Sequence, residues 1–205
     1  DTLESIASGL LERIGELDGD ATDHTTGMQQ VLDGLPDSDI IAVGHRVVHG
    51  GSRFIRPTML TDQIVAEIDR LSTLAPLHNP ANVLGIRAAR TAMPGVPHVA
   101  IFDTAFHHTL PPAAYTYALE RDLAREHDVR RYGFHGTSHE YVSRTAGEFL
   151  RRPLETLRTI VLHLGNGASA AAVDRGRSVD TTMGFTPMEG LLMGTRSVDI
   201  DPGVV

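Results

Sequence analysis

Four short apolar runs, each bounded by turn residues, alternate with stretches of helical spacing along this chain. The runs are residues 39–43, residues 98–102 ("HVAIF"), residues 159–164 ("TIVLHL") and residues 168–174 ("ASAAAVD"). Short apolar runs between turns indicate buried strands, and Arg175-Gly176 predicts a hairpin turn after the last of them. Because strands and helices are mixed throughout, we expect an α/β fold.

Helical periodicity and terminal residues predict five helices, two before the first of these strands and three after it. The first is expected although it contains Gly9, because its apolar residues recur at helical spacing. The signals are an apolar stripe over residues 3–14, a stop at Gly34, a cap at Thr61, the pair Asn79-Pro80 before a helix to about Met93, and the capping-box pair Thr137 and Glu140.

Composition excludes several classes of protein. The 205 residues allow one large domain or two small ones, and 41% of them are hydrophobic. No apolar run approaches the roughly 20 residues that cross a bilayer, and the acidic opening does not resemble a secretory signal, so we expect a cytoplasmic protein without a membrane partner. With no cysteine, the chain has neither disulfides nor thiolate metal sites.

Charge excludes two further functions. The net charge of -8 argues against nonspecific binding of nucleic acid, which depends on clustered positive charge. All 18 basic residues are arginine, so the chain contains no lysine that could serve a Walker-type phosphate loop. Any anion must therefore be bound by local sites of another kind.

Polar and glycine residues follow three of the predicted strands, at Gly44–Arg46, at Asp103 and at Gly165–Gly167. In open α/β sheets ligands bind at the carboxyl ends of strands, so these clusters are predicted to converge on one anion site. Glycines allow backbone amides to approach an anion, and Arg196 offers a planar fork to phosphate or carboxylate oxygens. The alternatives are that each cluster is only a turn and that Arg196 pairs with Asp199 or Asp201.

Histidines leave a second chemical class open. The chain has 11 of them, and His45 and His49, like His135 and His139, stand four residues apart. Such spacing on a helix could hold a metal ion. Both segments are expected to be poor helices, however, because the first is β-branched and glycine-rich and the second contains a helix cap. A metal-dependent hydrolase therefore remains the alternative to an anion-binding enzyme.

Six ordered blocks of sequence resemble one known family. They are "GHRVVHGG", "LAPLHNP", "FDTAFHHTLP", "RRYGFHGTSHEYV", "HLGNGAS" and "MGFTPMEGLLMGTRS". Together they resemble the acetate kinase family, within the superfamily of acetate and sugar kinases, Hsc70 and actin. The resemblance implies an incomplete two-domain actin-like (ribonuclease H-like) ATPase fold, with residues 1–103 in the N-terminal domain and residues 104–205 in the C-terminal domain. Propionate and butyrate kinases share these motifs.

The resemblance also implies a role for individual residues. Arg46 matches the substrate-binding arginine, Asp103 the essential acid, and His135 and Arg196 the groups that stabilise the transferring phosphoryl group. Since acetate is already ionised at neutral pH, Asp103 is expected to orient an arginine or hydrated Mg²⁺ rather than to act as a base. The acetate methyl pocket matches Val48, Leu77, Phe134 and Pro187, with His78 beside it, and the ATP phosphate segment matches His163, Leu164, Gly165, Asn166 and Gly167.

The implied reaction is transfer of the γ-phosphoryl group of ATP to acetate, with Mg²⁺, giving acetyl phosphate and ADP. The resemblance further implies a homodimer, and it places the Mg²⁺ ligands and the adenosine-binding loops outside this chain. Val198 stands where the family has glycine, and valine would be strained there if that position has a positive φ. A nonenzymatic relative that only binds nucleotides remains a further alternative.

Overall fold

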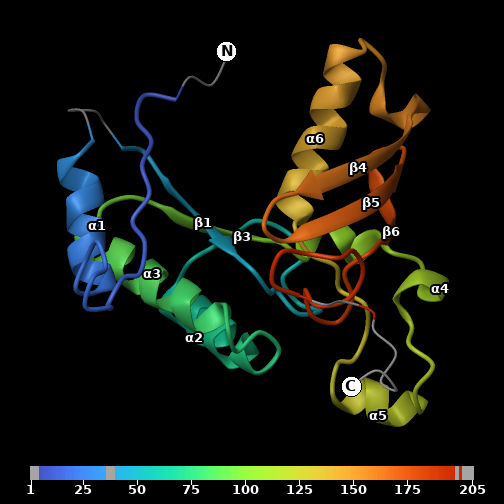
Figure 1. Cartoon of the computed structure of the whole chain (residues 1–205), viewed down its shortest axis with the longest axis horizontal. Coiled ribbons are helices and arrows are strands. Elements are labelled where there is room, and N and C mark those ends of the chain that lie inside the picture. Colours follow the sequence, from blue (N-terminus) through green and yellow to red (C-terminus); the bar gives the residue numbers. More distant parts are fainter. Residues whose placement is uncertain (1–4, 36–39, 197–198, 200–205) are drawn as a thin grey trace.

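The structure is a computed structural model in which residues 5–35, 40–196 and 199 are described. Within these residues the chain forms two three-stranded sheets (Figure 1). The first has the order β1-β3-β2 and comprises β1 (Val43–Val47), β2 (Thr58–Met59) and β3 (His98–Phe102). The second has the order β4-β5-β6 and comprises β4 (Arg158–Leu164), β5 (Ala168–Asp174) and β6 (Arg177–Thr181). The predicted α/β class is confirmed.

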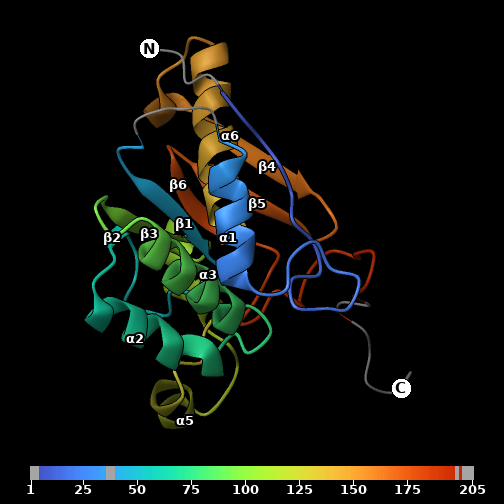
Figure 2. The same ribbon diagram turned by 90° about the vertical axis from the view of Figure 1, so that its left-hand side faces the viewer.

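The first sheet is covered by two helices that lie between β2 and β3 in the sequence. Strands β1 and β3 are parallel, with Val47 opposite Phe102 at their carboxyl ends, and β2 joins β3 in antiparallel orientation. Helix α2 (Asp62–Arg70) and helix α3 (Asn79–Ala92) pack beside the sheet, as Figure 2 shows. Their apolar faces and the strands share a core that includes Ile68 and Ile86, and α1 (His24–Asp33) lies against α3.

The second sheet is an antiparallel meander with α6 (Gly136–Phe149) along it (Figure 1). Arg175 and Gly176 both have positive φ, at 53° and 76°, which confirms the predicted hairpin turn between β5 and β6. Short helices lie between the two sheets in sequence: the 3₁₀-helix η2 (Ala105–Thr109), α4 (Pro112–Tyr115) and α5 (Arg121–Glu126). Two further 3₁₀ turns are η1 (Leu71–Thr73) and η3 (Leu154–Thr156).

The first strand lies further along the chain than its apolar run. Residues 40–42 are not in a strand, and β1 begins at Val43 and continues through His45 and Arg46 to Val47. The register with β3 explains the shift, because the ladder starts where Val43 faces His98. Arg46 is therefore held inside a strand, one residue before its end.

The predicted opening helix is wrong. Residues 5–12 form no regular secondary structure, and the side chains of Ile6 and Leu10 are 69% and 77% exposed. An amphipathic helix gains most of its stability from burying its apolar face. These residues bury little of theirs, and Gly9 and Gly15 weaken the helix further. The helix that ends before Gly34 is confirmed as α1.

Capping predictions are confirmed at one of three helices. The Thr61 hydroxyl accepts a hydrogen bond from the Ile64 amide, as expected for the cap of α2. At α3 the Asn79 side chain is used elsewhere, because it exchanges two hydrogen bonds of 3.1 Å with the backbone of His49. The predicted capping box of α6 is absent, since its cap position is His135 and no side chain caps it.

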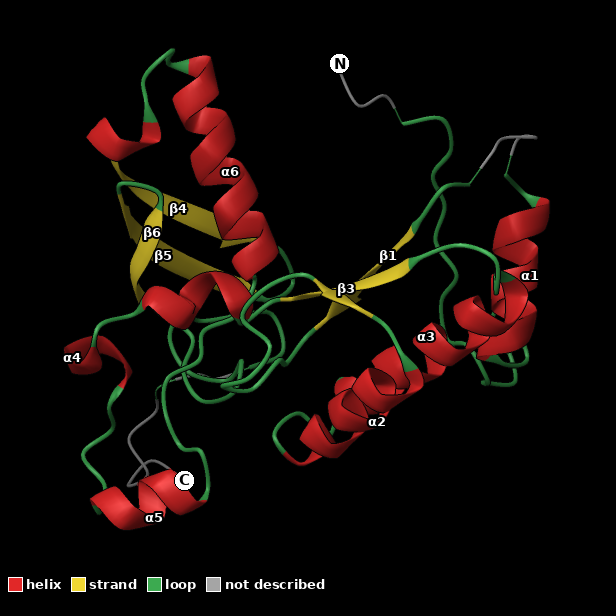
Figure 3. Ribbon diagram, turned by 180° about the vertical axis from the view of Figure 1, so that it is seen from behind, coloured by secondary structure: helices red, strands yellow, loops and turns green. Residues whose placement is uncertain are grey.

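The carboxyl ends of β1 and β3 meet the start of α6. The Gly136 amide donates to the Asp103 carbonyl at 2.9 Å, which joins the residue after β3 to the first turn of α6. A Cβ atom on Gly136 would lie 2.2 Å from that carbonyl oxygen, so only glycine allows this approach. Loops gather between the two sheets around this junction (Figure 3). No helix in the described part of the chain is long and apolar enough to span a membrane.

Candidate active site

Arg46 and Asp103 form the centre of the junction. The guanidinium Nε donates to Oδ1 of Asp103 at 2.9 Å and Nη2 donates to Oδ2 at 2.6 Å, a bidentate pair. The carboxylate is 1% exposed and the arginine side chain 61%. This hydrogen bonding raises the pKa of Arg46. Because a guanidinium has five N–H donors, the exposed remainder is free to bind an anion. Orientation of an arginine, one of the two roles expected for Asp103, is what the geometry supports.

His135 stands beside this pair at the start of α6. It has φ 56° and ψ 22°, in the left-handed region that non-glycine residues seldom adopt. Its Nδ1 lies 2.9 Å from the Ser169 hydroxyl, and its ring stacks on that of His163 with centroids 4.0 Å apart. Burial, then His163 and Arg46, lower the pKa of His135 to about 3. The imidazole is therefore neutral at physiological pH and acts through hydrogen bonds rather than charge.

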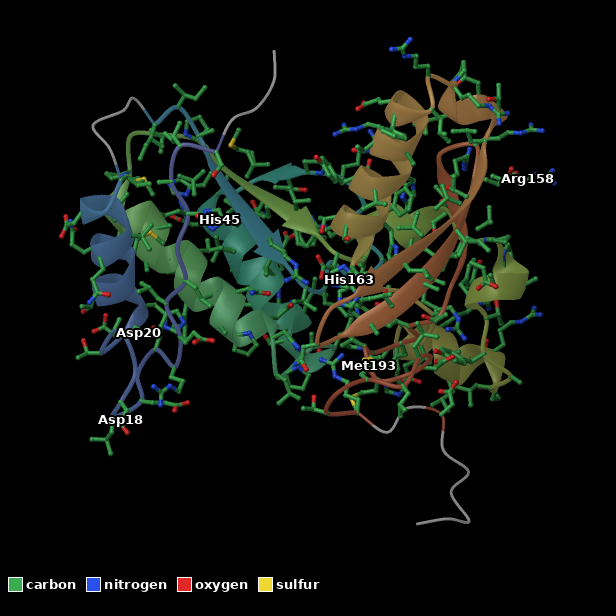
Figure 4. All side chains as sticks on the ribbon, turned by 45° about the horizontal axis from the view of Figure 1, so that its top comes forward. Asp18, Asp20, His45, Arg158, His163 and Met193 are labelled. Carbon is green, nitrogen blue, oxygen red and sulfur yellow. The ribbon has the colours of Figure 1, made fainter. Side chains whose placement is uncertain are left out.

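The glycine turn between β4 and β5 approaches both His135 and Arg196. A Cβ atom on Gly167 would lie 3.2 Å from Nε2 of His135 and 3.5 Å from Nη1 of Arg196. Arg196 is oriented by the Pro187 carbonyl, which accepts from Nη1 at 2.8 Å. His163 lies near the middle of the molecule, whereas Arg158 lies at the opposite end of β4 (Figure 4). The structure thus brings the predicted phosphate segment, His163 to Gly167, to the two phosphoryl-binding candidates.

The residues predicted to form the methyl pocket are only partly brought together. Val48 packs against a buried cluster that contains Phe134, Met183 and Met193. Pro187 contacts Arg196 through its backbone carbonyl and is not a member of this cluster. Leu77 is 85% exposed and does not belong to this cluster.

His78, which was predicted to lie beside the pocket, responds to the charges of the site. Its pKa is lowered by burial and by the positive charges of Arg196 and Arg46, while Asp103 raises it. His78 is half-buried and precedes α3 as its cap residue. The charges of both arginines thus act on this imidazole.

Two polar residues of the site were missed from the sequence. Ser169, in β5, is fully buried and bonds both His135 and His139, whereas the run "ASAAAVD" predicts only a buried strand. Thr137 lies 3.4 Å from Oδ1 of Asp103 instead of capping α6. The available signal for Ser169 was its strand periodicity, which places it on the same face as the buried Ala171 and Val173.

The histidine pairs do not form a metal centre. Among the described residues, no group of three or more histidine, aspartate or glutamate side chains is placed to hold a metal ion. His45 bonds Nδ1 of His98 at 2.9 Å, and Nε2 of His98 donates to the Met93 carbonyl. The segment from His135 to His139 contains the cap of α6, as expected, but at His135, so His139 lies within the helix and faces Ser169. The hydrolase alternative is not supported.

Two predictions about the last residues have different outcomes. Val198 and Asp201 lie outside the described residues, so the question of strain at Val198 and the pairing of Arg196 with Asp201 do not arise here. Asp199 accepts a hydrogen bond from the Gly190 amide, and Arg196 contacts Pro187.

Comparison with known proteins decides the family. The profile of the acetokinase family matches residues 11–205. The chain belongs to the acetokinase family. It is 57% identical to the acetate kinase of Clavibacter michiganensis subsp. michiganensis, over 100% of this chain and 57% of that protein. The chain thus spans little more than half the length of this relative of the family.

Solved structures of the family share the fold. The acetate kinase of Porphyromonas gingivalis superposes with a TM-score of 0.87 and 42% identity, over 95% of this chain and 55% of that one. A propionate kinase from Francisella tularensis subsp. tularensis superposes with a TM-score of 0.86 and 40% identity, over the same shares of the two chains. The chain therefore has part of the actin-like ATPase fold of the acetokinase family.

Proposed function

We propose that the complete protein transfers the γ-phosphoryl group of ATP to acetate, reversibly giving acetyl phosphate and ADP. The observation that carries the proposal is the convergence of two guanidinium groups, a neutral imidazole and a glycine turn at the carboxyl ends of β1 and β3. The names of the relatives support the same reaction, since acetate kinases match the whole of this chain.

We propose different roles for the two arginines. Acetate is ionised at neutral pH and needs no general base, so its carboxylate requires only a cationic partner in a fixed position. Arg46 offers that partner, because Asp103 holds one edge of its guanidinium and leaves the other exposed. Arg196 lies beside the glycine turn, where the phosphoryl oxygens of ATP would be bound.

Charge on the transferring phosphoryl group would then be stabilised by donors already in place. In phosphoryl transfer the transition state spreads negative charge over three equatorial oxygens, and catalysis consists mainly of positioning and electrostatic stabilisation. Arg196 and Nε2 of His135 both lie within 3.5 Å of the position that a Cβ atom on Gly167 would take. Fixed donors of this kind do not have to reorganise as the charge develops.

The preference for acetate is proposed from one wall of the pocket. Val48 packs beside Phe134, and a further methylene on the substrate would have to displace one of these side chains. Because a propionate kinase has nearly the same fold, the distinction depends on small differences in pocket volume. We include Leu77 in this wall only as a prediction, since its side chain is exposed.

Mg²⁺ is proposed as the companion of ATP, but the described residues do not by themselves fit a metal site. They contain no cluster of metal ligands, and both oxygens of the buried Asp103 carboxylate are bonded to Arg46. The roles derived from the geometry therefore belong to protein side chains alone. The division into domains at residues 103 and 104, a homodimeric assembly and a cytoplasmic location are further parts of the proposal and rest on the resemblance to the family.

Trapping of acetyl phosphate with hydroxylamine tests the proposal in the complete protein. We expect acetate-dependent product with ATP, and a loss of about 10²- to 10³-fold in kcat in Arg196→Ala, the usual effect of removing one preorganised donor. Arg158→Ala is the matched control, because Arg158 is 82% exposed and pairs with Asp174 at the far end of β4. Nucleotide binding without any acetyl phosphate would instead identify a nonenzymatic relative.

A further inference from the structure

Ser169 lies between two imidazoles in the buried part of the site. Its side chain is fully buried, and its hydroxyl oxygen lies 2.9 Å from Nδ1 of His135 and 2.8 Å from Nε2 of His139. His139 is also fully buried. Buried polar groups are nearly always hydrogen-bonded, and the described partners of this hydroxyl are the two rings.

The single hydroxyl proton of Ser169 couples the two rings. Serine donates one hydrogen bond and accepts others, while a neutral imidazole has one N–H and one nitrogen lone pair. Among the described residues, the two imidazoles are the partners of this hydroxyl. If both rings donated to Ser169, its own proton would be buried without an acceptor. Ser169 therefore donates to one ring and accepts from the other.

The surroundings of His139 decide the direction. No described group lies within hydrogen-bonding distance of its buried Nδ1. If Ser169 donated to His139, the ring proton would have to sit on that Nδ1, and buried N–H groups without an acceptor are rare. If His139 donates from Nε2 to Ser169, only a lone pair is left without a partner. The hydroxyl proton of Ser169 then points to Nδ1 of His135.

We propose that Ser169 is a positioning residue which, together with His139, holds His135 in the tautomer that carries its proton on Nε2. That nitrogen faces Gly167 and Arg196, where the phosphoryl group is proposed to bind. The chain His139–Ser169–His135 turns a neutral imidazole into a hydrogen-bond donor toward an anion. With the opposite tautomer, His135 would present a lone pair and repel the same oxygen. The catalytic consequence rests on the proposed function, whereas the hydrogen-bond chain itself does not.

Nitrogen NMR of the complete protein labelled with ¹⁵N-histidine tests the tautomer without any assay of activity. Protonated and unprotonated ring nitrogens have well separated ¹⁵N shifts, and the His135 signals are assigned by their loss in His135→Asn. We expect His135 and His139 both to carry the proton on Nε2. A proton on Nδ1 of His135 would overturn the proposal, and this reading of the wild-type protein stands even if a Ser169 variant does not fold.

Ser169→Ala and Ser169→Thr extend the test. In Ser169→Ala, part of the His135 population should carry its proton on Nδ1, so the ¹⁵N shifts of the ring should take averaged, intermediate values. In Ser169→Thr, which keeps a hydroxyl, the shifts should stay as in the wild type. Because Ser169 acts through a group that binds the transition state, kcat should fall about five- to tenfold with KM for acetate unchanged. Unchanged His135 shifts in Ser169→Ala would refute the proposal. A complete protein that forms no acetyl phosphate would defeat the proposed function, while the spectra would still decide the tautomer.

Ser178→Ala separates positioning from stability. Ser178 is fully buried like Ser169, and its hydroxyl lies 2.7 Å from Nδ1 of His107, whose Nε2 donates to the Phe134 carbonyl. Removing the Ser178 hydroxyl takes away one buried serine–histidine hydrogen bond, and removing the Ser169 hydroxyl takes away two. Both variants should lower the melting temperature, but only Ser169→Ala should alter the tautomer of His135. An equal change in the His135 spectrum of both variants would count against the proposal.

Discussion

Acid should destabilise this protein steeply, because three histidines are buried in neutral form. The side chains of His49, His107 and His139 are all 0% exposed. Burial is the largest cause that lowers the pKa of each to about 4, from an ordinary value of 6.5. When a folded-state pKa lies below the unfolded value, the stability it reflects is fully present above pH 6.5 and is lost as the pH falls toward 4.

The dependence of the unfolding free energy on pH follows from the number of protons that the folded and unfolded chains bind. Between about pH 6 and pH 4.5 the unfolded chain binds nearly one more proton at each of these histidines than the folded chain does. One proton is worth about 1.4 kcal/mol per pH unit, so the three residues together give a slope of about 4 kcal/mol per pH unit. A domain of ordinary stability, about 5–15 kcal/mol, would thus unfold in mildly acidic solution.

Urea unfolding followed by far-ultraviolet circular dichroism, repeated at half-unit steps of pH, measures this slope. In His107→Gln the amide cannot titrate, so the slope should decrease by about 1.4 kcal/mol per pH unit, the contribution of one histidine, even if stability at pH 7.5 is also lower. His127→Asn is the control, because His127 is exposed at the end of α5 and its replacement should leave the slope unchanged. A slope in His107→Gln equal to that of the wild type would refute the reasoning.

Three further predictions concern the site. Arg46→Lys should recover little of the turnover lost in Arg46→Ala, measured with acetate and ATP, because a lysine ammonium cannot make the bidentate contact with Asp103. Val48→Ala should raise the ratio of kcat/KM for propionate to that for acetate by at most tens of fold, and an unchanged ratio would exclude Val48 from the pocket. Gly136→Ala should lower stability by about 1–3 kcal/mol and reduce turnover, because its Cβ would meet the Asp103 carbonyl at 2.2 Å, whereas Gly85→Ala, with nothing within 4 Å, should leave both unharmed.

Strand positions could be predicted from the sequence only where the apolar pattern and the pairing agree. The runs "HVAIF", "TIVLHL" and "ASAAAVD" coincide with β3, β4 and β5, because each is apolar over the length that pairs. Residues 39–43 were misplaced by several positions, since β1 carries His45 and Arg46 as ladder residues. Strand register is decided by the partner strand, which no local pattern contains.

The site was predicted better in its residues than in its connections. Arg46, Asp103 and His135 were selected from motifs, and in the structure Arg46 bonds Asp103, whose carbonyl accepts from the amide of Gly136 next to His135. The hydroxyl groups that contact His135 and Asp103 were missed, because in the sequence Ser169 has the pattern of a core serine and Thr137 that of a helix cap. Which hydroxyl reaches which imidazole depends on how α6 packs against β5. These two elements are separated in the sequence by β4, so no local sequence pattern reports their contact.

At His135, the backbone conformation that lowers the stability of the fold belongs to the residue whose side chain is proposed to support turnover. A φ of 56° in a residue with a side chain costs about 1–2 kcal/mol, a cost that glycine does not bear. Laboratory evolution that selects only for thermal stability should therefore favour His135→Gly. Selection for acetyl phosphate production should retain the histidine. Variants recovered from the two selections should diverge at residue 135 before they diverge in the surrounding core.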